Sequence, residues 1–525
     1  MGMERSLIPE LRAWVALALP HAFSRLLELL PWMIQLMIVG RVGLRELAAL
    51  SLLELWLYPW MIILWEGIST AESTLVSQAH GARRVSSMRG WALVSLGALV
   101  VGSVVVTIAW LNSKRALDAM GFDPNLSALA QSYSTWALPA MWLESFTMAM
   151  DAYLGASQIV LPPLLVRVAV AGMDVAVCIL LVFGWPGYPG GWRDKMAALG
   201  FGWSVAAAVN FLGEATILRL YLGRELEFGH LEEEGGEGGG EQGGEKGEER
   251  AGLEPLLLNS GSPSSSDAQP PPASWGTPQT LWRFFLSPTR WRSFSAQALP
   301  ALGTSFLSNV QFTIISLMAA SLGDVPLSTH NTIICLFEVI HTVCTGMGEA
   351  TSTRVGFHIG RGDERGARQA LRIALVAAGV WGLGCAAGGL LLREYTGRLF
   401  TNDAAVLSLS AELAPLMWPA YGVLTLGDVA FGALSGTGRS DAVGVAFGLG
   451  TWGVGLPCAA LALRLKPEWG LRGLWGALLL GYFVASVAAF VLVARTDWGA
   501  AIEQAREREE AEEGEGEGEE MGAEE

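Results

Sequence analysis

The sequence predicts an all-α polytopic membrane protein with twelve transmembrane helices in two six-helix repeats, and three observations lead to this fold class. The 525 residues are 51% hydrophobic and only 16% charged, whereas soluble globular proteins carry about 25% charged residues. The mean hydropathy is +0.39. Long apolar stretches recur along both halves of the chain, and the two halves share motifs at equal spacing. This composition argues against an ordinary soluble enzyme.

A membrane-spanning helix needs about 20 mostly apolar residues. Twelve stretches meet this requirement, six on each side of a long polar break, and the first is expected to be a retained span because no short cleavable signal region precedes it. The predicted spans are 13–40, 46–78, 90–111, 129–154, 162–184 and 196–221, followed by 292–320, 327–357, 368–392, 405–434, 441–463 and 471–495.

The negative charge of the chain is confined to two low-complexity segments. The net charge is −16, and residues 225–250 and 503–525 together hold 22 acids against four bases. Such segments bury too little apolar surface to order themselves. The chain is therefore divided into a cytosolic N-terminus (1–12), a first lobe (13–222), a disordered acidic, Gly-, Ser- and Pro-rich cytosolic loop (223–290), a second lobe (291–497) and a disordered acidic tail (498–525). No nucleic-acid partner is expected.

The two halves carry the same motif near the end of their second span. Gly67 is followed fourteen residues later by Gly81, and Gly346 is followed fourteen residues later by Gly360. Because each repeat has an even number of spans, both repeats enter the membrane from the same side. Parallel repeats of this kind are typical of transporters, whose sites lie at the repeat interface.

The orientation follows from basic residues in the short loops. Arginines concentrate in the loops 81–90 and 354–372, which lie on the same side as both termini. Because cytosolic loops carry an excess of Lys and Arg, we expect both termini and the 223–290 loop in the cytosol. The five cysteines and six histidines form no metal-binding spacing, so no metal or cofactor is expected.

Several short motifs, taken together and in order, resemble the eukaryotic members of the multidrug and toxic compound extrusion (MATE) transporters. They are Leu17–Pro20, Gly67–Gly81, Ser157–Pro162, Arg354–Gly362, Gly432–Gly438, Gly470–Trp475 and Thr496–Trp498.

This resemblance implies two six-helix lobes around a central cavity and an antiporter instead of an enzyme. Such an antiporter exports organic cations, drugs, toxins or metabolites in exchange for H⁺ or Na⁺. It implies a monomer in the plasma membrane or a vacuolar or other organellar membrane, with small organic molecules and the lipid bilayer as its partners.

Ionisable residues inside the predicted spans are the candidate site, because a charge at bilayer depth is costly and is retained for function. Glu214 is set aside, since we expect it near a helix end, and Arg25 with Glu28 are expected to neutralise each other. The candidates for ion coupling are Asp428, Glu338, Asp151 and Asp174, of which Asp151 and Asp428 occupy equivalent positions in the two repeats. The gating or secondary candidates are Glu66, Glu72, Glu349, Gln35, Asn309 and Gln311.

The resemblance also exposes departures from the family pattern. The seventh span has no acid where eukaryotic members carry a Glu, and it offers Asn309 and Gln311 instead. The tenth has Leu424 at the family's acidic position, and the first has Gln35 where bacterial relatives often have Asp. Asp174 stands where the family often has Asn. The coupling ion therefore stays open.

Aromatic side chains are expected to contact an organic cation in the cavity through cation–π interactions. The candidates are Trp65, Tyr153 and Tyr421. Two alternatives remain. A lipid-linked oligosaccharide flippase of the same superfamily would need a basic cavity, yet Arg25 and Arg167 are the only bases deep in or near a span. A polytopic membrane enzyme would need a catalytic cluster, which is not apparent.

The topology can be tested directly. We expect cysteine labelling from one side of the membrane to reach both the N-terminus and residue 240, because six spans separate them. Labelling that places these two positions on opposite sides would contradict the arrangement of six plus six spans.

Overall fold

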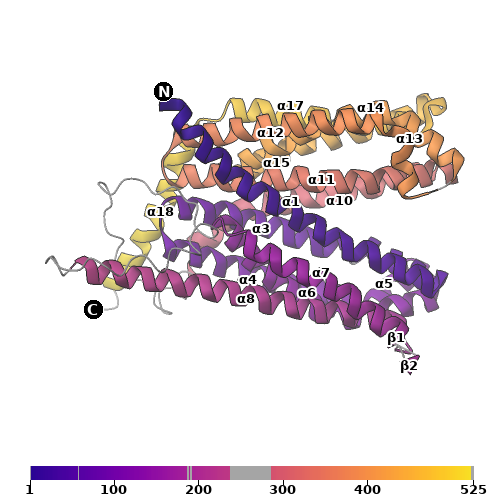
Figure 1. Ribbon diagram of the computed structural model, residues 1–525, viewed down its shortest axis with the longest axis horizontal. Coiled ribbons are helices and arrows are strands. Elements are labelled where there is room, and N and C mark those ends of the chain that lie inside the picture. Colours follow the sequence, from indigo (N-terminus) through magenta and orange to yellow (C-terminus); the bar gives the residue numbers. More distant parts are fainter. Residues whose placement is uncertain are drawn as a thin grey trace, which may run out of the picture.

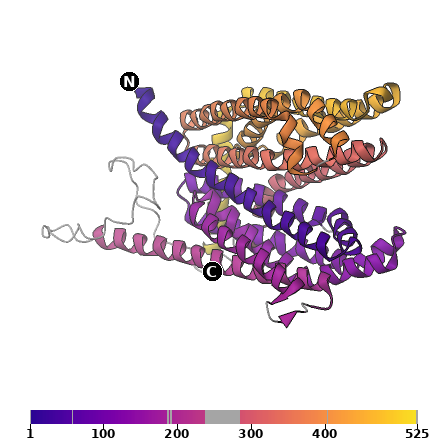
Figure 2. The same ribbon diagram turned by 45° about the vertical axis from the view of Figure 1, so that its right-hand side comes forward.

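The computed structural model describes residues 2–56, 58–185, 188–189, 192–236, 285–401 and 403–521. Within these ranges the chain is almost entirely helical, and its strands are β1 (Gly184–Trp185) and β2 (Tyr188–Pro189), which pair antiparallel in one loop. Figures 1 and 2 show the two halves of the chain as helical bundles lying side by side, with α1 running obliquely along their boundary.

The first half contains eight helices in its described part. They are α1 (Gly2–Val42), α2 (Leu44–Trp56), α3 (Tyr58–Gly81), α4 (Val85–Leu111), α5 (Ser113–Ala119), α6 (Pro124–Ala156), α7 (Leu161–Phe183) and α8 (Lys195–Gly236).

The second half follows the same plan with more interruptions. It comprises α10 (Pro288–Ala320), α11 (Asp324–Gly360), α12 (Glu364–Leu391), α13 (Arg393–Thr396), the short 3₁₀ helix η2 (Gly397–Leu399), α14 (Ala404–Gly436), α15 (Ser440–Phe447), the π-helical η3 (Gly448–Gly455), α16 (Leu456–Leu465), the 3₁₀ turn η4 (Pro467–Trp469), α17 (Gly470–Ala494) and α18 (Trp498–Met521).

Each of the twelve predicted spans coincides with a helix or a run of helices. The second predicted span is divided between α2 and α3, and the eleventh is formed by α15, η3 and α16. Nine helices in the described ranges are long and apolar enough to cross a bilayer by length and composition. The other three predicted spans are α2 with α3, α6, which contains Pro139, and α14, which contains Pro415 and Pro419. The predicted fold class is confirmed.

The two halves touch closely through the repeated glycines that end α3 and α11. A Cβ atom on Gly81 would lie 1.9 Å from the carbonyl oxygen of Phe357, and one on Gly360 would lie 1.8 Å from the carbonyl oxygen of Gln78. Only glycine allows this approach of two backbones. We call this contact between the ends of α3 and α11 the seam.

Hydrogen bonds reinforce the seam. Gln78 Nε2 donates to the carbonyl oxygen of Gly436 at 3.0 Å, and Thr74 Oγ1 donates to that of Ser435 at 3.1 Å. Both bonds run from α3 of the first half to the end of α14 in the second. The motif that revealed the duplication is therefore also the motif that joins the two halves.

The predicted boundaries at the polar segments differ from the structure. Helix α1 already begins at Gly2, α8 continues to Gly236 and α10 begins at Pro288, so both ends of the predicted loop 223–290 are helical. The rest of that predicted disordered loop, 237–284, lies outside the described residues.

The acidic tail was expected to be solvated and disordered apart from a short helix at its start, and the structure shows a helix that is longer than expected. Residues Trp498–Met521 form α18, whose buried side chains include Trp498, Ala501 and Ala505. With Ile502, these residues form an apolar stripe at spacings of three and four, which suits a docked helix. The abundance of glutamate after residue 506 had concealed this pattern.

Helix α18 lies across the seam end of both bundles (Figure 1). Arg508 Nη1 donates to Gln78 Oε1 at 3.0 Å, and Arg84 Nε lies 3.3 Å from Glu509 Oε2. On the second half, the guanidinium of Arg368 lies 5.5 Å from the ring centroid of Trp498. The start of the tail thus contacts both lobes.

Two truncations separate the packed part of the tail from its acidic end. We expect a chain ending at Trp498 to unfold about 2–5 °C lower in a thermal melt, since it loses the stripe residues after Trp498 and the contact of Arg508 with α3. A chain ending at Glu510 keeps these contacts and should melt as the full-length protein does. Equal melting of all three proteins would refute the docking of α18.

Candidate functional site

The candidate acid of the second half, Asp428, lies beside a histidine. Asp428 on α14 faces His341 on α11, with 3.6 Å between Oδ2 and Nε2, and their side chains are 18% and 33% exposed. The imidazole of His341 stacks on Phe337, with 4.9 Å between the ring centroids. Glu338 is one turn away from His341 on the same helix and acts on it electrostatically. Asp428, Glu338 and His341 therefore form one acid–imidazole cluster.

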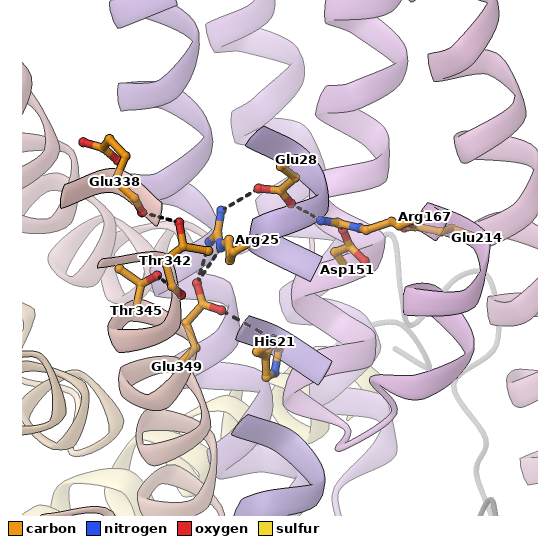
Figure 3. Close-up of polar contacts among 10 residues, drawn as sticks. All are labelled: His21, Arg25, Glu28, Asp151, Arg167, Glu214, Glu338, Thr342, Thr345 and Glu349. Carbon is orange, nitrogen blue, oxygen red and sulfur yellow. Dashed lines mark hydrogen bonds and ion pairs between the residues drawn. The ribbon is translucent and has the colours of Figure 1, made fainter. Parts of the chain in front are cut away.

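The equivalent acid of the first half has a different kind of partner. Asp151 on α6 forms an ion pair with Arg167 of α7, which also binds Glu28 of α1. Arg167 Nε lies 3.9 Å from Oε1 of Glu214 on α8, and Glu214 is fully buried. Figure 3 shows Arg167 among these acids, which come from three different helices. Glu214 was set aside as a residue near a helix end, but the structure buries it on α8 beside Arg167 of α7.

A third cluster joins the two halves. Arg25 Nε of α1 donates to Oε1 of Glu349 on α11 at 3.1 Å, and Arg25 Nη2 binds the same oxygen. His21 Nδ1 lies 3.4 Å from Oε2 of Glu349. The expected pairing of Arg25 with Glu28 is also present at 3.3 Å. Arg25 thus lies between an acid of its own helix and an acid of the other lobe (Figure 3).

Glu66 links this interlobe cluster to the histidine cluster. It lies on α3, and Ser305 of α10, in the other lobe, is among its neighbours. It is exposed although it lies in the middle of a spanning helix. Its electrostatic neighbours are Arg25, Glu349 and His341. The gating candidates Glu66 and Glu349 are therefore neighbours at the lobe boundary.

The remaining acids of the first half have neutral partners. Asp174 is nearly buried and accepts a hydrogen bond from Gln35 Nε2 at 3.1 Å and one from the Cys178 thiol at 3.6 Å. Glu72 is fully buried and accepts a hydrogen bond from Ser95. The hydrogen-bond partners of both acids belong to the first lobe.

The two amides of the seventh predicted span do not replace its missing acid. Asn309 Nδ2 donates to the carbonyl oxygen of Ser305 at 2.9 Å, so this side chain is bonded to its own helix. Gln311 is fully buried beside Tyr482. The side chain that faces Asp428 is instead the imidazole of His341.

The three aromatic candidates are mostly packed inside the lobes. Tyr153 and Tyr421 are each 3% exposed, so in this conformation they do not face open space. Tyr421 packs instead against Phe337 and Trp418, at centroid distances of 5.4 and 5.5 Å. Trp65 is part-buried and donates from Nε1 to Ser145 Oγ at 2.9 Å.

The partners decide which acids are able to exchange a proton near neutral pH. An arginine stays protonated in proteins, so the partner of Asp151 is a permanent cation. A histidine changes its charge in the physiological range. Equivalent positions in the two repeats therefore have unlike partners, with an arginine beside Asp151 and a histidine beside Asp428.

The sequence analysis did not name His341 as a candidate site residue, although its spacing of three from Glu338 places both on one helix face. The partner of His341 comes from α14, 87 positions along the chain, and no local pattern connects them. Within the described ranges, no group of three or more His, Cys, Asp or Glu side chains is arranged to hold a metal ion.

Comparison with known proteins gives a consistent family match. The MatE family model matches residues 20–180 and 300–461, one segment in each half. Mouse multidrug and toxin extrusion protein 2 is 24% identical over 97% of this chain and 79% of its own length. Protein DETOXIFICATION 1 of Arabidopsis thaliana is 24% identical over 95% of this chain and 93% of its own length.

Solved structures support the same fold. The eukaryotic MATE transporter AtDTX14 superposes with a TM-score of 0.74 at 20% identity, covering 96% of this chain and 99% of its own. A point mutant of the Vibrio cholerae MATE transporter VcmN gives a TM-score of 0.77 at 14% identity, covering 94% of this chain and 99% of its own.

Arg167 should be a structural requirement of the first lobe. Replacing it with Ala leaves Asp151 and the buried Glu214 without their cation, while Glu28 keeps only its pair with Arg25. Breaking a buried ion pair on one side costs about 3–5 kcal/mol. We expect Arg167→Ala to lower the yield of monodisperse protein in size-exclusion chromatography and to lower its melting temperature strongly.

The matched control for that variant is Arg472→Ala, which breaks an exposed pair with Glu412. Exposed pairs contribute at most about 1 kcal/mol, so this control should melt close to the unmodified protein. If Arg167→Ala is as stable as Arg472→Ala, the network does not support the first lobe.

Proposed function

The chain belongs to the MatE family, and from this premise we propose that it is a secondary antiporter that exports organic cations in exchange for protons. The family consists of efflux transporters, so the chain is a multi-pass membrane transporter and not an enzyme. The names of its relatives refer to the extrusion of drugs and toxins, which makes small organic solutes the first substrates to test.

The observation that carries the proposal is the facing pair of His341 and Asp428. A proton that arrives at this pair neutralises the carboxylate or charges the imidazole, and either event removes net negative charge from the site. An organic cation and a proton therefore compete for the same negative charge. Competition for one site, combined with access from one side at a time, produces exchange.

The charge balance around the lobe boundary supports a cationic substrate. Acids outnumber permanent bases there, so the surroundings favour a bound cation. The acids are Glu28, Glu66, Asp151, Glu214, Glu338, Glu349 and Asp428, and the arginines are Arg25 and Arg167.

The same contacts argue against the flippase alternative. A pyrophosphate-linked substrate needs basic side chains that are available to bind phosphate. Arg25 already binds Glu349 and Glu28, and Arg167 already binds three acids. The charge of both arginines is therefore already balanced by acids.

Coupling to protons is favoured over coupling to Na⁺ by the same pair. A sodium site needs several oxygen ligands around the ion, whereas Asp428 is faced by an imidazole. We assign the coupling role to Asp428 with His341, keep Glu338 as the second candidate, and give Asp151 a structural role beside Arg167. Asp174 remains a candidate inside the first lobe.

Transport by Asp428→Asn tests this assignment. In proteoliposomes with an imposed pH gradient, we expect this variant to lose gradient-driven efflux of a fluorescent organic cation, because an amide cannot take up the coupling proton. Asp428→Glu should retain part of the activity with a shifted pH optimum. His341→Gln should flatten the pH dependence.

The matched control is Asp151→Asn, at the equivalent position of the other repeat. Arg167 retains Glu28 and Glu214 in this variant, and we expect gradient-driven efflux to continue. Efflux by Asp428→Asn at the rate and pH dependence of the unmodified protein would disprove the assignment. Efflux that is driven by a Na⁺ gradient at constant pH would show that Na⁺, and not H⁺, is the coupling ion.

A further inference from the structure

We propose that Glu349 is a binding carboxylate for the transported organic cation, and that Arg25 occupies it as a built-in counter-ion until the cation arrives. The inference rests on the proposed antiport function and adds to it a substrate-binding group. It also gives a route by which the substrate itself loosens a contact between the lobes.

The contacts define Glu349 as a site that binds cations. Its two carboxylate oxygens face different partners on α1, with Oε1 bound by the guanidinium of Arg25 and Oε2 lying 3.4 Å from His21 Nδ1. A planar guanidinium is itself an organic cation, so the protein already shows what kind of group this carboxylate accepts.

The accessibility of the pair separates it from a structural ion pair. The side chains of Arg25 and Glu349 are 36% and 34% exposed, although both lie well inside long spanning helices. The Arg167 side chain, by contrast, is only 12% exposed. A ligand between the lobes is therefore able to reach Glu349 without first unpacking a helix, whereas Asp151 and Glu214 are covered by Arg167.

A displaced Arg25 has another acceptor. Its Nη1 already lies 3.3 Å from Oε2 of Glu28 on the same helix. When a substrate cation takes the Glu349 carboxylate, the guanidinium retains an ion pair through Glu28 and is not left uncompensated inside the membrane. This second acid keeps the free-energy cost of exchanging partners low, because no charge becomes isolated at any stage.

The exchange acts on the lobes because the two partners of Arg25 belong to different lobes. Glu349 lies on α11 of the second half, while Glu28 lies on α1 of the first. Displacement therefore removes a direct ion pair between the halves at the level of Glu66 and Ser305, which make another interlobe contact. Substrate binding is thereby connected to lobe separation.

The test is equilibrium binding of radiolabelled tetraphenylphosphonium to the purified full-length protein in nanodiscs, without any ion gradient. We expect Arg25→Ala to bind this probe about two- to fivefold more tightly, the change that loss of a part-exposed competing ion pair produces. Arg25→Lys, which retains the charge but not the fork of donors, should fall between Arg25→Ala and the unmodified protein.

The double variant Arg25→Ala/Glu349→Gln isolates the carboxylate, since the competing arginine is absent from both proteins compared. We expect the double variant to lose the gain made by Arg25→Ala and to bind more weakly than the unmodified protein. Arg472→Ala, which breaks the Arg–Glu pair with Glu412 outside the site, serves as the control and should bind as the unmodified protein does.

Three outcomes would overturn the inference. They are unchanged or weaker binding by Arg25→Ala, a gain that persists in the double variant, and the absence of probe binding in every protein. The gradient-driven transport of Asp428 variants tests the proposed antiport separately. If gradient-driven exchange is normal but Glu349 has no effect on probe binding, only the binding role of Glu349 is refuted. If the probe binds through Glu349 but gradient-driven exchange is absent, only the proposed antiport is refuted.

Discussion

The pairing of charges inside a bilayer is the constraint on which the account of this protein depends. An ionised side chain at that depth is costly unless it has a partner, and this chain places many acids there. Two arginines neutralise several of these acids. Arg167 binds Asp151, Glu28 and Glu214, and Arg25 binds Glu28 and Glu349. The acid that faces His341 has a partner whose own charge depends on pH. The choice of partner therefore separates the acids packed around Arg167 from the acid that faces a histidine.

The duplication explains how these clusters meet at the lobe boundary. Gly67 packs against Leu302 of α10, and Gly346 packs against the backbone of Ala22 on α1, so the matching glycines of the repeats each contact the opposite lobe. This close packing brings α1 alongside α11 and places Arg25 within reach of Glu349. Close contacts at these glycines thus set the geometry in which the charged side chains act.

The sequence predicted the twelve spans, the duplication and the family, because hydropathy and repeated glycines are local patterns. It also identified Asp428, Glu338, Glu66 and Glu349 as candidates. It could not assign partners, since Asp428 and His341 are joined only by the packing of α14 on α11. Tyr153 and Tyr421 turned out to be buried because helix faces cannot be oriented from composition alone. The docked stripe of α18 was present in the spacing of Trp498, Ala501, Ile502 and Ala505, but the acidic composition concealed it.

The central claim is that one titratable pair exchanges a proton for an organic cation, and proton movement measures this directly. In proteoliposomes loaded with a pH-sensitive dye, an outward cation gradient should drive protons inward in a fixed ratio to cation efflux, with no Na⁺ present. The His341–Asp428 account predicts that this proton movement disappears together with efflux when the pair is removed. Cation efflux at full rate without any proton movement would contradict it.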